Sequence, residues 1–478
     1  MLFDTLGFAF FLSVVFLLYW FVANKSLSNQ NTLLLVSSYF FYSCWDWKFL
    51  SLLLLSTLID YLIGLKIHKK ENNSGRKFWL VLSIVINLSL LCTFKYYNFF
   101  ISSFNELMTA LKIQANLSTL NLILPIGISF YTFHGLSYVI DIYNRKTEPD
   151  SNFINYAVFV SFFPLLVAGP IERATHLLPQ IQKERKFDYG KAVDGLRQIL
   201  WGLFKKIVIS NQCSIYSNII FNNPSIFSGS TLLMGAVIFA FQIYADFSGY
   251  TDIALGTARL FGIELLQNFS SPYFSRNLTQ FWRRWHISLS SWFRDYLYIP
   301  LGGSKKGKWI TIRNTMIIFL IGGFWHGANW TFVIWGFINA IYLIPSILFQ
   351  KETFEKDKIT KLKVIPSLSE FFQMSRTFML IALVCIFFRS QDISHAISYF
   401  SGMLSKSTFT LPAIRPVLLF FVIGLFLIIE WKGRDQTHAL KNFALKSHKV
   451  LRLIFYYSLI IAIFLSRTPE QKFIYFQF

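Results

Sequence analysis

Apolar blocks long enough to cross a lipid bilayer recur from one end of the sequence to the other. Hydrophobic residues make up 54% of the 478-residue chain and charged residues only 14%, which is about half the charged share of soluble domains. Because a membrane-crossing helix needs about 20 apolar residues, the pattern predicts an all-α polytopic membrane protein with about 11–12 transmembrane helices. The expected spans lie near residues 5–23, 32–47, 48–66, 78–99, 120–142, 199–221, 231–248, 313–326, 328–349, 377–390, 415–431 and 450–466.

Basic residues gather in the short segments between these blocks and account for the net charge of +21. Such loops are typical of the cytoplasmic side of a membrane, so membrane lipids are expected as partners and nucleic acid is not. This orientation puts both termini on the periplasmic side of a bacterial inner membrane. Two further apolar segments, 153–170 and 281–300, lie between basic flanks and are interpreted as re-entrant or interfacial helices. We expect a single membrane-embedded domain, residues 1–478, with a core at 120–349.

His326 is the first candidate for chemistry, because it lies in the apolar segment Gly322–Gly327, where two expected spans meet. An ionisable side chain is costly at membrane depth and usually functional there. Imidazole changes its charge near neutral pH and can serve as a general base. The neighbouring glycines permit close backbone approach. A histidine that only hydrogen-bonds a neighbouring helix is the alternative, and the residues alone leave both interpretations open.

Residues 281–295 form a second candidate, with three Trp, three Arg and one His in fifteen positions. The guanidinium groups of Arg283, Arg284 and Arg294 are suited to bidentate phosphate binding. Trp285 offers a stacking surface. On the cytoplasmic side, this segment could bind a nucleotide-bearing thioester such as acetyl-CoA. Anchoring of an interfacial helix to lipid headgroups explains the same composition equally well.

Three other segments allow a structural interpretation, and two of them also allow a functional one. Asp246 and Asp252 follow a long apolar span and either orient a histidine or cap the helix. His134 is interpreted as structural. The aromatic tail at 471–478 either anchors in the interface or returns into a groove, where it would present the Tyr475 hydroxyl. No metal site is expected, because the four cysteines are scattered without ligand spacing.

Five blocks of the sequence are distinctive: Leu124–Phe133, Val167–Ile171, Asp246–Tyr250, Phe281–Gly303 and Gly322–Gly336. They resemble the membrane-bound O-acyltransferase family, in the branch of the alginate O-acetyltransferase membrane subunit, with peptidoglycan O-acetyltransferases close by. The similarity implies a ring of helices around a central tunnel. It also implies that His326 matches the family's essential histidine and His286 its second histidine, on the cytoplasmic side. The tail is similar to that of the small partner protein in teichoic-acid D-alanylation, in which a tyrosine is proposed to carry the acyl group.

From the resemblance we expect a membrane O-acetyltransferase with His326, His286 and Tyr475 as its catalytic residues. Its donor would be acetyl-CoA as a substrate, with no tightly bound cofactor. A periplasmic SGNH-type acetyltransferase partner would receive the acetyl group for an exported polysaccharide, such as alginate or peptidoglycan. A polytopic transporter and a non-catalytic scaffold for a periplasmic transferase are the alternatives. Transporters commonly contain internal repeats, and the sequence has none.

Overall fold

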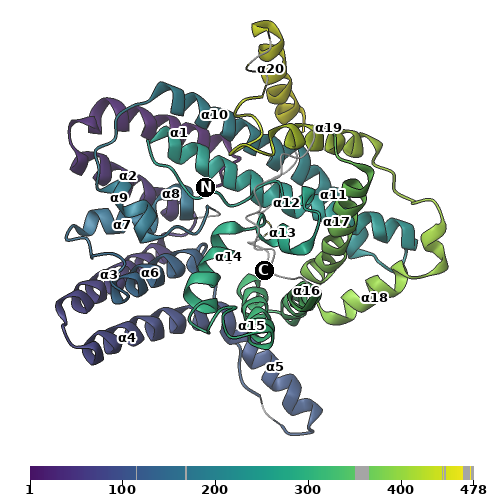
Figure 1. Ribbon diagram of the computed structural model, residues 1–478, viewed down its shortest axis with the longest axis horizontal. Coiled ribbons are helices and arrows are strands. Elements are labelled where there is room, and N and C mark those ends of the chain that lie inside the picture. Colours follow the sequence, from purple (N-terminus) through teal and green to yellow (C-terminus); the bar gives the residue numbers. More distant parts are fainter. Residues whose placement is uncertain are drawn as a thin grey trace. The chain divides into compact units, whose positions relative to one another are not determined.

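The computed structural model describes residues 1–114, 116–166, 169–349, 365–443, 445, 448–466 and 474. These residues form helices joined by turns and loops, without a strand (Figure 1). They divide into two compact units. Unit 1 comprises Met1–Gly195 and Ala254–Leu266, and unit 2 comprises Leu196–Ile253 and Gln267–Phe478. The all-α prediction is confirmed.

Unit 1 begins with α1, which continues through η1 and η2 as one helical run from Leu6 to Lys25. Some of its apolar residues pack in the core, whereas others, such as Phe10 and Phe21, are exposed. Exposed apolar side chains of this kind suit a lipid-facing surface. The helices that follow are α2 (Leu27–Ser43), α3 (Trp47–Lys69), α4 (Asn73–Leu91), α5 (Tyr97–Ala110), α6 (Ile128–Tyr143), α7 (Phe153–Ser161), α8 (Phe163–Leu166) and α9 (Ala174–Ile181).

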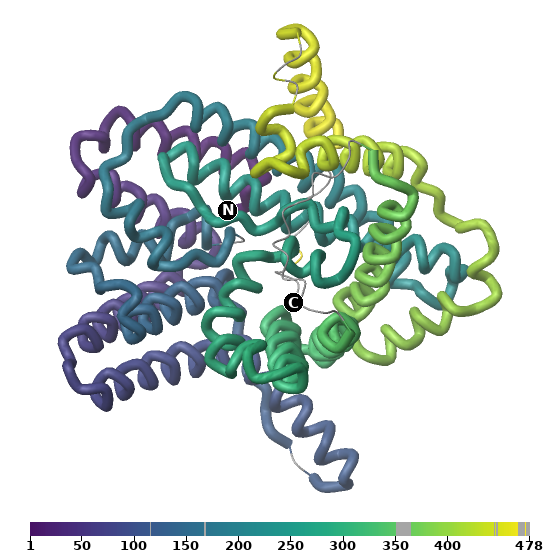
Figure 2. Tube along the Cα trace, in the orientation of Figure 1, coloured from purple at the N-terminus to yellow at the C-terminus, as the bar shows by residue number. Residues whose placement is uncertain are grey.

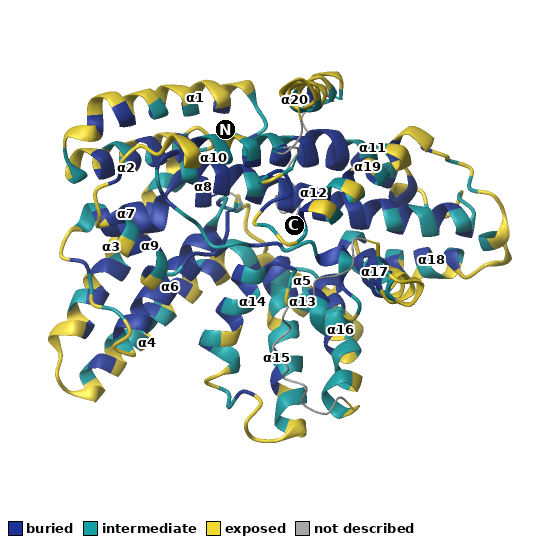
Figure 3. Ribbon diagram, turned by 45° about the horizontal axis from the view of Figure 1, so that its top comes forward, coloured by how far each residue is buried: buried dark blue, intermediate teal, exposed yellow. Residues whose placement is uncertain are grey.

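Unit 2 contains both candidate segments of the sequence. Two long helices, α10 (Tyr189–Leu203) and α12 (Gly229–Leu260), contribute residues to both units. Figure 3 shows α12 largely in the colour of buried residues. The other elements of unit 2 are η4 (Phe204–Ser210), α11 (Asn211–Asn222), η5 (Pro272–Phe274), α13 (Leu278–Trp282), α14 (Ile287–Phe293), η6 (Arg294–Tyr298), α15 (Lys308–His326), α16 (Trp330–Phe349), α17 (Leu368–Arg389), α18 (Ile393–Met403), η7 (Lys406–Phe409), α19 (Val417–Gly433) and α20 (Lys449–Leu465).

Six helices among the described residues are long and apolar enough to cross a membrane, and each overlaps an expected span. They are Leu6–Lys25, Trp47–Lys69, Asn73–Ala110, Gly229–Leu260, Trp330–Phe349 and Leu368–Arg389. Helices α2, α19 and α20, at 17 residues each, occupy three more expected spans. The chain is therefore a multi-pass membrane protein, while the total of about 11–12 crossings stays a prediction.

The span expected at 120–142 is wrong at its start, because α6 begins only at Ile128. Residues 120–127 form loop and turn instead, and a side-chain amide of α5 holds the backbone of Leu120. Asn98 donates to the carbonyl oxygen of Leu120 and accepts from its N–H, over 2.8 and 2.9 Å. Gly127 then adopts a φ of 74°, a conformation that glycine adopts without steric cost. Apolar composition alone could not distinguish this loop from helix.

Candidate active site

The two histidines singled out in the sequence lie next to each other in unit 2. The ring centroids of His286 and His326 are 6.4 Å apart. Both side chains are buried, with 2% and 6% of their surface exposed. His326 is the last residue of α15, and His286 immediately precedes α14. Because 40 positions separate them in the sequence, their proximity comes from the tertiary fold.

Close packing of two helices determines where His326 lies. Helices α15 and α16 run side by side, as Figure 2 shows. A Cβ atom on Gly323 would collide with the carbonyl oxygen of Phe332, and one on Gly336 with the carbonyl oxygen of Phe319. Small residues at such crossings let helix backbones approach directly. Gly323 and Gly336 are therefore required by packing, and they bring α16 against the end of α15.

Aromatic rings surround the imidazole of His326. The ring of Trp335 from α16 meets it edge-on, with centroids 5.2 Å apart. Phe388 from α17 lies 5.3 Å away in a similar orientation, and Trp325 lies 5.1 Å away. Side chains of this kind exclude water and lower the local dielectric, which strengthens electrostatic interactions within the site.

His286 is held in one orientation by Asn268. The Nδ1 atom of His286 lies 3.0 Å from Oδ1 of Asn268. That oxygen also accepts hydrogen bonds from the Ser288 hydroxyl and backbone N–H, so Asn268 presents its acceptor side. His286 must therefore donate from Nδ1, which leaves the Nε2 lone pair available. No partner for Nε2 occurs among the described residues.

The backbone of His286 is also unusual, with a φ of 45° in the left-handed region. Non-glycine residues seldom adopt this conformation, and it concentrates at functional sites. Here the turn ends the segment that contains Arg283 and starts α14. It directs the imidazole inward, where its ring meets Phe247 of α12 edge-on at 4.7 Å.

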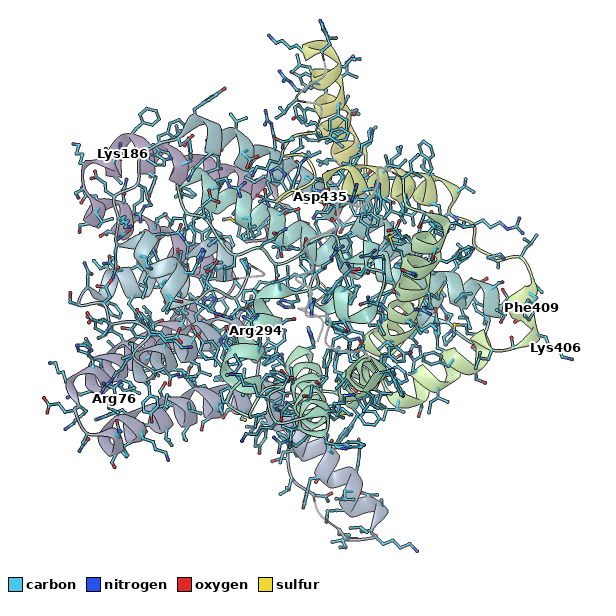
Figure 4. The ribbon with its side chains drawn as sticks, viewed as in Figure 1. Arg76, Lys186, Arg294, Lys406, Phe409 and Asp435 are labelled. Carbon is cyan, nitrogen blue, oxygen red and sulfur yellow. The ribbon has the colours of Figure 1, made fainter. Side chains whose placement is uncertain are left out.

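A cavity of about 290 Å³ extends from His326 to two arginines of the sequence motif. Arg283 and Arg294 line it together with Tyr298, and both arginines are exposed to solvent. Figure 4 labels Arg294, the residue that follows α14. The volume is close to that of the smaller ligand pockets in proteins, about 300 Å³. Cationic groups and the buried imidazole thus border one continuous space.

A second, much smaller cavity of about 20 Å³ also reaches His326. Trp282 and Trp335 border both cavities, so they stand between the two together with the imidazole. Roughly 10–15 Å³ accommodates one water molecule, so the small cavity has room for a group of that size. Its remaining walls are Ile243, Phe281, Trp285, Asn339, Ile381, Cys385 and Phe388.

The structure brings some of the predicted site residues together and leaves others apart. Arg284 does not line the cavity that Arg283 and Arg294 border. Trp285 is buried, stacks on Phe281 with centroids 5.4 Å apart, and faces the small cavity. It therefore does not share a wall with the two arginines. Tyr475 lies outside the described residues.

His134, the other histidine of an expected span, is in unit 1 and has a structural environment. Its Nε2 atom accepts a hydrogen bond from the backbone N–H of Glu172 over 3.1 Å. Its Nδ1 atom lies 3.5 Å from the carbonyl oxygen of Val160. Both ring nitrogens thus face backbone groups, as expected for a histidine that joins neighbouring segments.

Sequence reasoning missed several residues that surround His326. Asn268 orients His286 from a loop, and Trp335, Asn339 and Phe388 form walls from α16 and α17. The sequence around Asn268 shows only a polar residue next to the aromatic Phe269, which does not indicate that Asn268 contacts a histidine. For the others, helical periodicity indicates burial but does not identify the buried partner.

Comparison with known proteins places this geometry in context. Residues 34–390 match the model of the MBOAT, membrane-bound O-acyltransferase family. The chain is 37% identical to the peptidoglycan O-acetyltransferase of Helicobacter pylori, over 84% of this chain and 80% of that protein. It is 36% identical to the probable alginate O-acetylase of Pseudomonas aeruginosa, over 86% and 76%. A teichoic acid D-alanyltransferase of Bacillus subtilis is 31% identical over 48% and 61%.

Proposed function

Because the chain belongs to the membrane-bound O-acyltransferase family, we propose that this O-acyltransferase takes acetyl from cytosolic acetyl-CoA and passes it across the membrane. The acetyl group then modifies a polysaccharide outside the cytoplasm. Relatives named for alginate and peptidoglycan O-acetylation, each similar over more than four fifths of the chain, support a polysaccharide acceptor. Both termini are periplasmic in this proposal.

One observation carries the proposal, namely that His326 borders two cavities on either side of Trp282 and Trp335. In the larger cavity, Arg283 and Arg294 hold the phosphates of the donor, and the pantetheine arm extends toward His326. The thioester then lies next to a buried imidazole in a space with little water. Holding the reacting groups in this geometry lowers the barrier by several kcal/mol.

In the transfer step, His326 removes the proton of an acceptor hydroxyl while the hydroxyl oxygen attacks the thioester carbon. The carbon–sulfur bond breaks, and the thiolate recovers the proton from His326 to leave as free CoA. The new bond is an oxygen ester. General base catalysis of this kind contributes about 10²–10⁴-fold. His286 offers its Nε2 lone pair to the positive charge that develops on His326.

The acceptor in this proposal is the Tyr475 hydroxyl, which approaches from the periplasmic side. Donor and acceptor then reach His326 from opposite faces of the membrane, so only the acetyl group crosses. A periplasmic SGNH-type acetyltransferase partner next moves the acetyl from the tyrosyl ester to the polysaccharide. The ester oxygen recovers a proton from the polysaccharide hydroxyl, which regenerates Tyr475.

The small cavity supports acetyl as the transferred group. Its walls are mainly apolar side chains, including Ile381 and Phe388, and its volume is about 20 Å³. Roughly 10–15 Å³ suffices for a water molecule, so a cavity of about 20 Å³ suits a slightly larger group such as the methyl of an acetyl group. Longer acyl chains would have to displace buried aromatic rings, which is costly in a well-packed core.

The test is His326→Gln in the purified full-length protein, with release of free CoA from acetyl-CoA as the readout. We expect the rate to fall by about 10²–10⁴-fold, with unchanged thermal stability. His134→Gln is the matched control, because it alters a second buried histidine outside the two cavities. Retention of CoA release and of cell-surface acetylation by His326→Gln would refute the proposal and favour a scaffold for a periplasmic transferase.

A further inference from the structure

Asp246 of α12 is a buried carboxylate with two different partners. Its Oδ1 atom lies 2.6 Å from Nζ of Lys206, which belongs to η4. Its Oδ2 atom accepts a hydrogen bond from the backbone N–H of Ile474 over 2.8 Å. Asp246 and Ile474 each have 2% of their surface exposed, and Lys206 has 1%.

This arrangement binds a backbone group of the C-terminal segment inside unit 2. Burying an ion pair costs desolvation energy, which further hydrogen bonds must offset. Here the second carboxylate oxygen is satisfied by a main-chain donor that lies eight residues beyond Ser466. Charge-assisted hydrogen bonds of this type are about twice as strong as neutral ones. Because Asp246 binds an N–H group, the contact does not depend on the side chain of Ile474.

Asp246 also belongs to the part of α12 that contacts the active site. Ile243 lines the small cavity beside His326, and Phe247 packs on the ring of His286. Residues three and four positions apart lie on one face of a helix, so Asp246 shares the face of Ile243. The backbone of Ile474 is therefore bound within one helical turn of residues that touch the site.

We propose that Asp246, held by Lys206, is a positioning residue that seats the C-terminal segment so that the hydroxyl of the adjacent Tyr475 meets the thioester. The inference rests on the proposed function, because it assumes that Tyr475 is the acceptor. Lys206 pairs with one carboxylate oxygen of Asp246, which leaves the other oxygen to accept the hydrogen bond from the segment. The transfer itself is unchanged, with the tyrosine proton passing through His326 to the leaving thiol.

The main experiment removes the pair without leaving a buried charge. In Asp246→Leu with Lys206→Met, apolar side chains replace both ions, a change that is often neutral for stability. The matched control is Asp252→Leu with Lys205→Met, since that pair joins the same two elements over 2.5 Å. The full-length proteins are incubated with acetyl-CoA that is labelled in the acetyl group. Label on Tyr475 is measured by peptide mass spectrometry, and hydrolysis of acetyl-CoA is measured as release of free CoA.

We expect label on Tyr475 to fall at least tenfold in the Asp246/Lys206 variant and to stay near wild type in the control. Slow hydrolysis of acetyl-CoA, in which water replaces the tyrosine as acceptor, needs only the donor and His326 and therefore persists in both variants. Equal labelling in the two variants would overturn the role of Asp246. Absence of label from wild-type Tyr475 would overturn both this inference and the acceptor assignment, while His326-dependent CoA release would leave the donor half of the proposed function intact.

A second variant addresses the hydrogen bond directly. Ile474→Pro removes the N–H donor at a position beyond α20, and Ile474→Val keeps it. We expect the proline variant to reproduce the loss of label and the valine variant to retain it, with equal melting temperatures. A proline variant that labels as well as the valine variant would refute the anchoring contact even if the Asp246/Lys206 variant failed to fold.

Discussion

The Nδ1 atom of His286 lies 3.0 Å from Oδ1 of Asn268, and this contact selects the tautomer that leaves Nε2 free. Asn268→Ala would leave a buried N–H donor unsatisfied, which costs about 1–3 kcal/mol. We expect kcat for acetyl transfer to fall about tenfold or more, with little change in KM for acetyl-CoA. Ser288→Ala removes one hydrogen bond to Asn268 and should have a smaller effect. An unaltered kcat in Asn268→Ala would show that the orientation of His286 is unimportant.

The two arginines of the large cavity predict a phosphate-dependent effect on donor binding. Arg283→Gln and Arg294→Gln should each raise KM for acetyl-CoA by about five- to thirtyfold, since charge-assisted hydrogen bonds at a partly exposed site contribute about 1–2 kcal/mol. With acetyl-pantetheine, which lacks the nucleotide phosphates, the same variants should resemble wild type. Arg284→Gln is the control, because Arg284 does not line the cavity. Equal effects of all three substitutions would contradict the assignment.

The crossing of α15 and α16 predicts a packing defect at Gly336. In Gly336→Ala, the new methyl group would meet the carbonyl oxygen of Phe319. Overpacking of this kind costs about 1–3 kcal/mol and displaces the end of α15, so both melting temperature and activity should fall. Gly424→Ala in α19 adds the same methyl group where nothing lies within 4 Å. If Gly336→Ala is as stable and active as Gly424→Ala, the crossing is looser than described.

The small cavity predicts that acyl-chain preference can be changed from α17. Ile381→Ala removes apolar volume from the wall of this cavity. One methylene group is worth about 1–3 kcal/mol in such pockets, so the ratio of kcat/KM for propionyl-CoA over acetyl-CoA should rise about tenfold. Ile386→Ala makes the same change on the same helix at a buried residue that does not line the cavity. A ratio that moves equally in both variants would exclude a size filter at Ile381.

His176 of unit 1, outside the membrane-spanning helices, predicts a pH dependence of stability. Its hydrogen bond to Glu172 over 2.8 Å raises the pKa of His176 above its ordinary value of 6.5. Because the pKa is raised in the folded protein, the contribution of the His176–Glu172 pair to stability is complete below about pH 6.5. It is lost as the pH rises through the pKa of the folded state. Because 37% of the His176 side chain is exposed, solvent screening limits this contribution to less than about 1 kcal/mol.

The measurement for His176 is the melting temperature of wild type and His176→Gln in detergent. The stabilisation of wild type over the variant should be larger at about pH 6 than at about pH 8.5. His448→Gln is a suitable control, because His448 is an exposed helix cap. A difference that is constant or grows with pH would contradict the role of the His176–Glu172 pair.

Much of the architecture was accessible from the sequence because the membrane constrains it locally. A helix that crosses lipid satisfies its backbone hydrogen bonds internally, so apolar length alone located α1, α3, α12, α16 and α17. The cost of an ionisable side chain at depth singled out His326. The same criterion also selected His134, whose ring nitrogens face backbone groups.

The tertiary structure decided which residues meet. Ile243, Trp335 and Phe388 are distant in sequence, and only the packing of α12, α16 and α17 around the end of α15 brings them to one small cavity. The sequence likewise contained Asp246 and Ile474 without any local pattern that joins them. Periodicity determines which face of a helix is buried, whereas the partner of that face depends on long-range packing, and the chemistry proposed here depends on those partners.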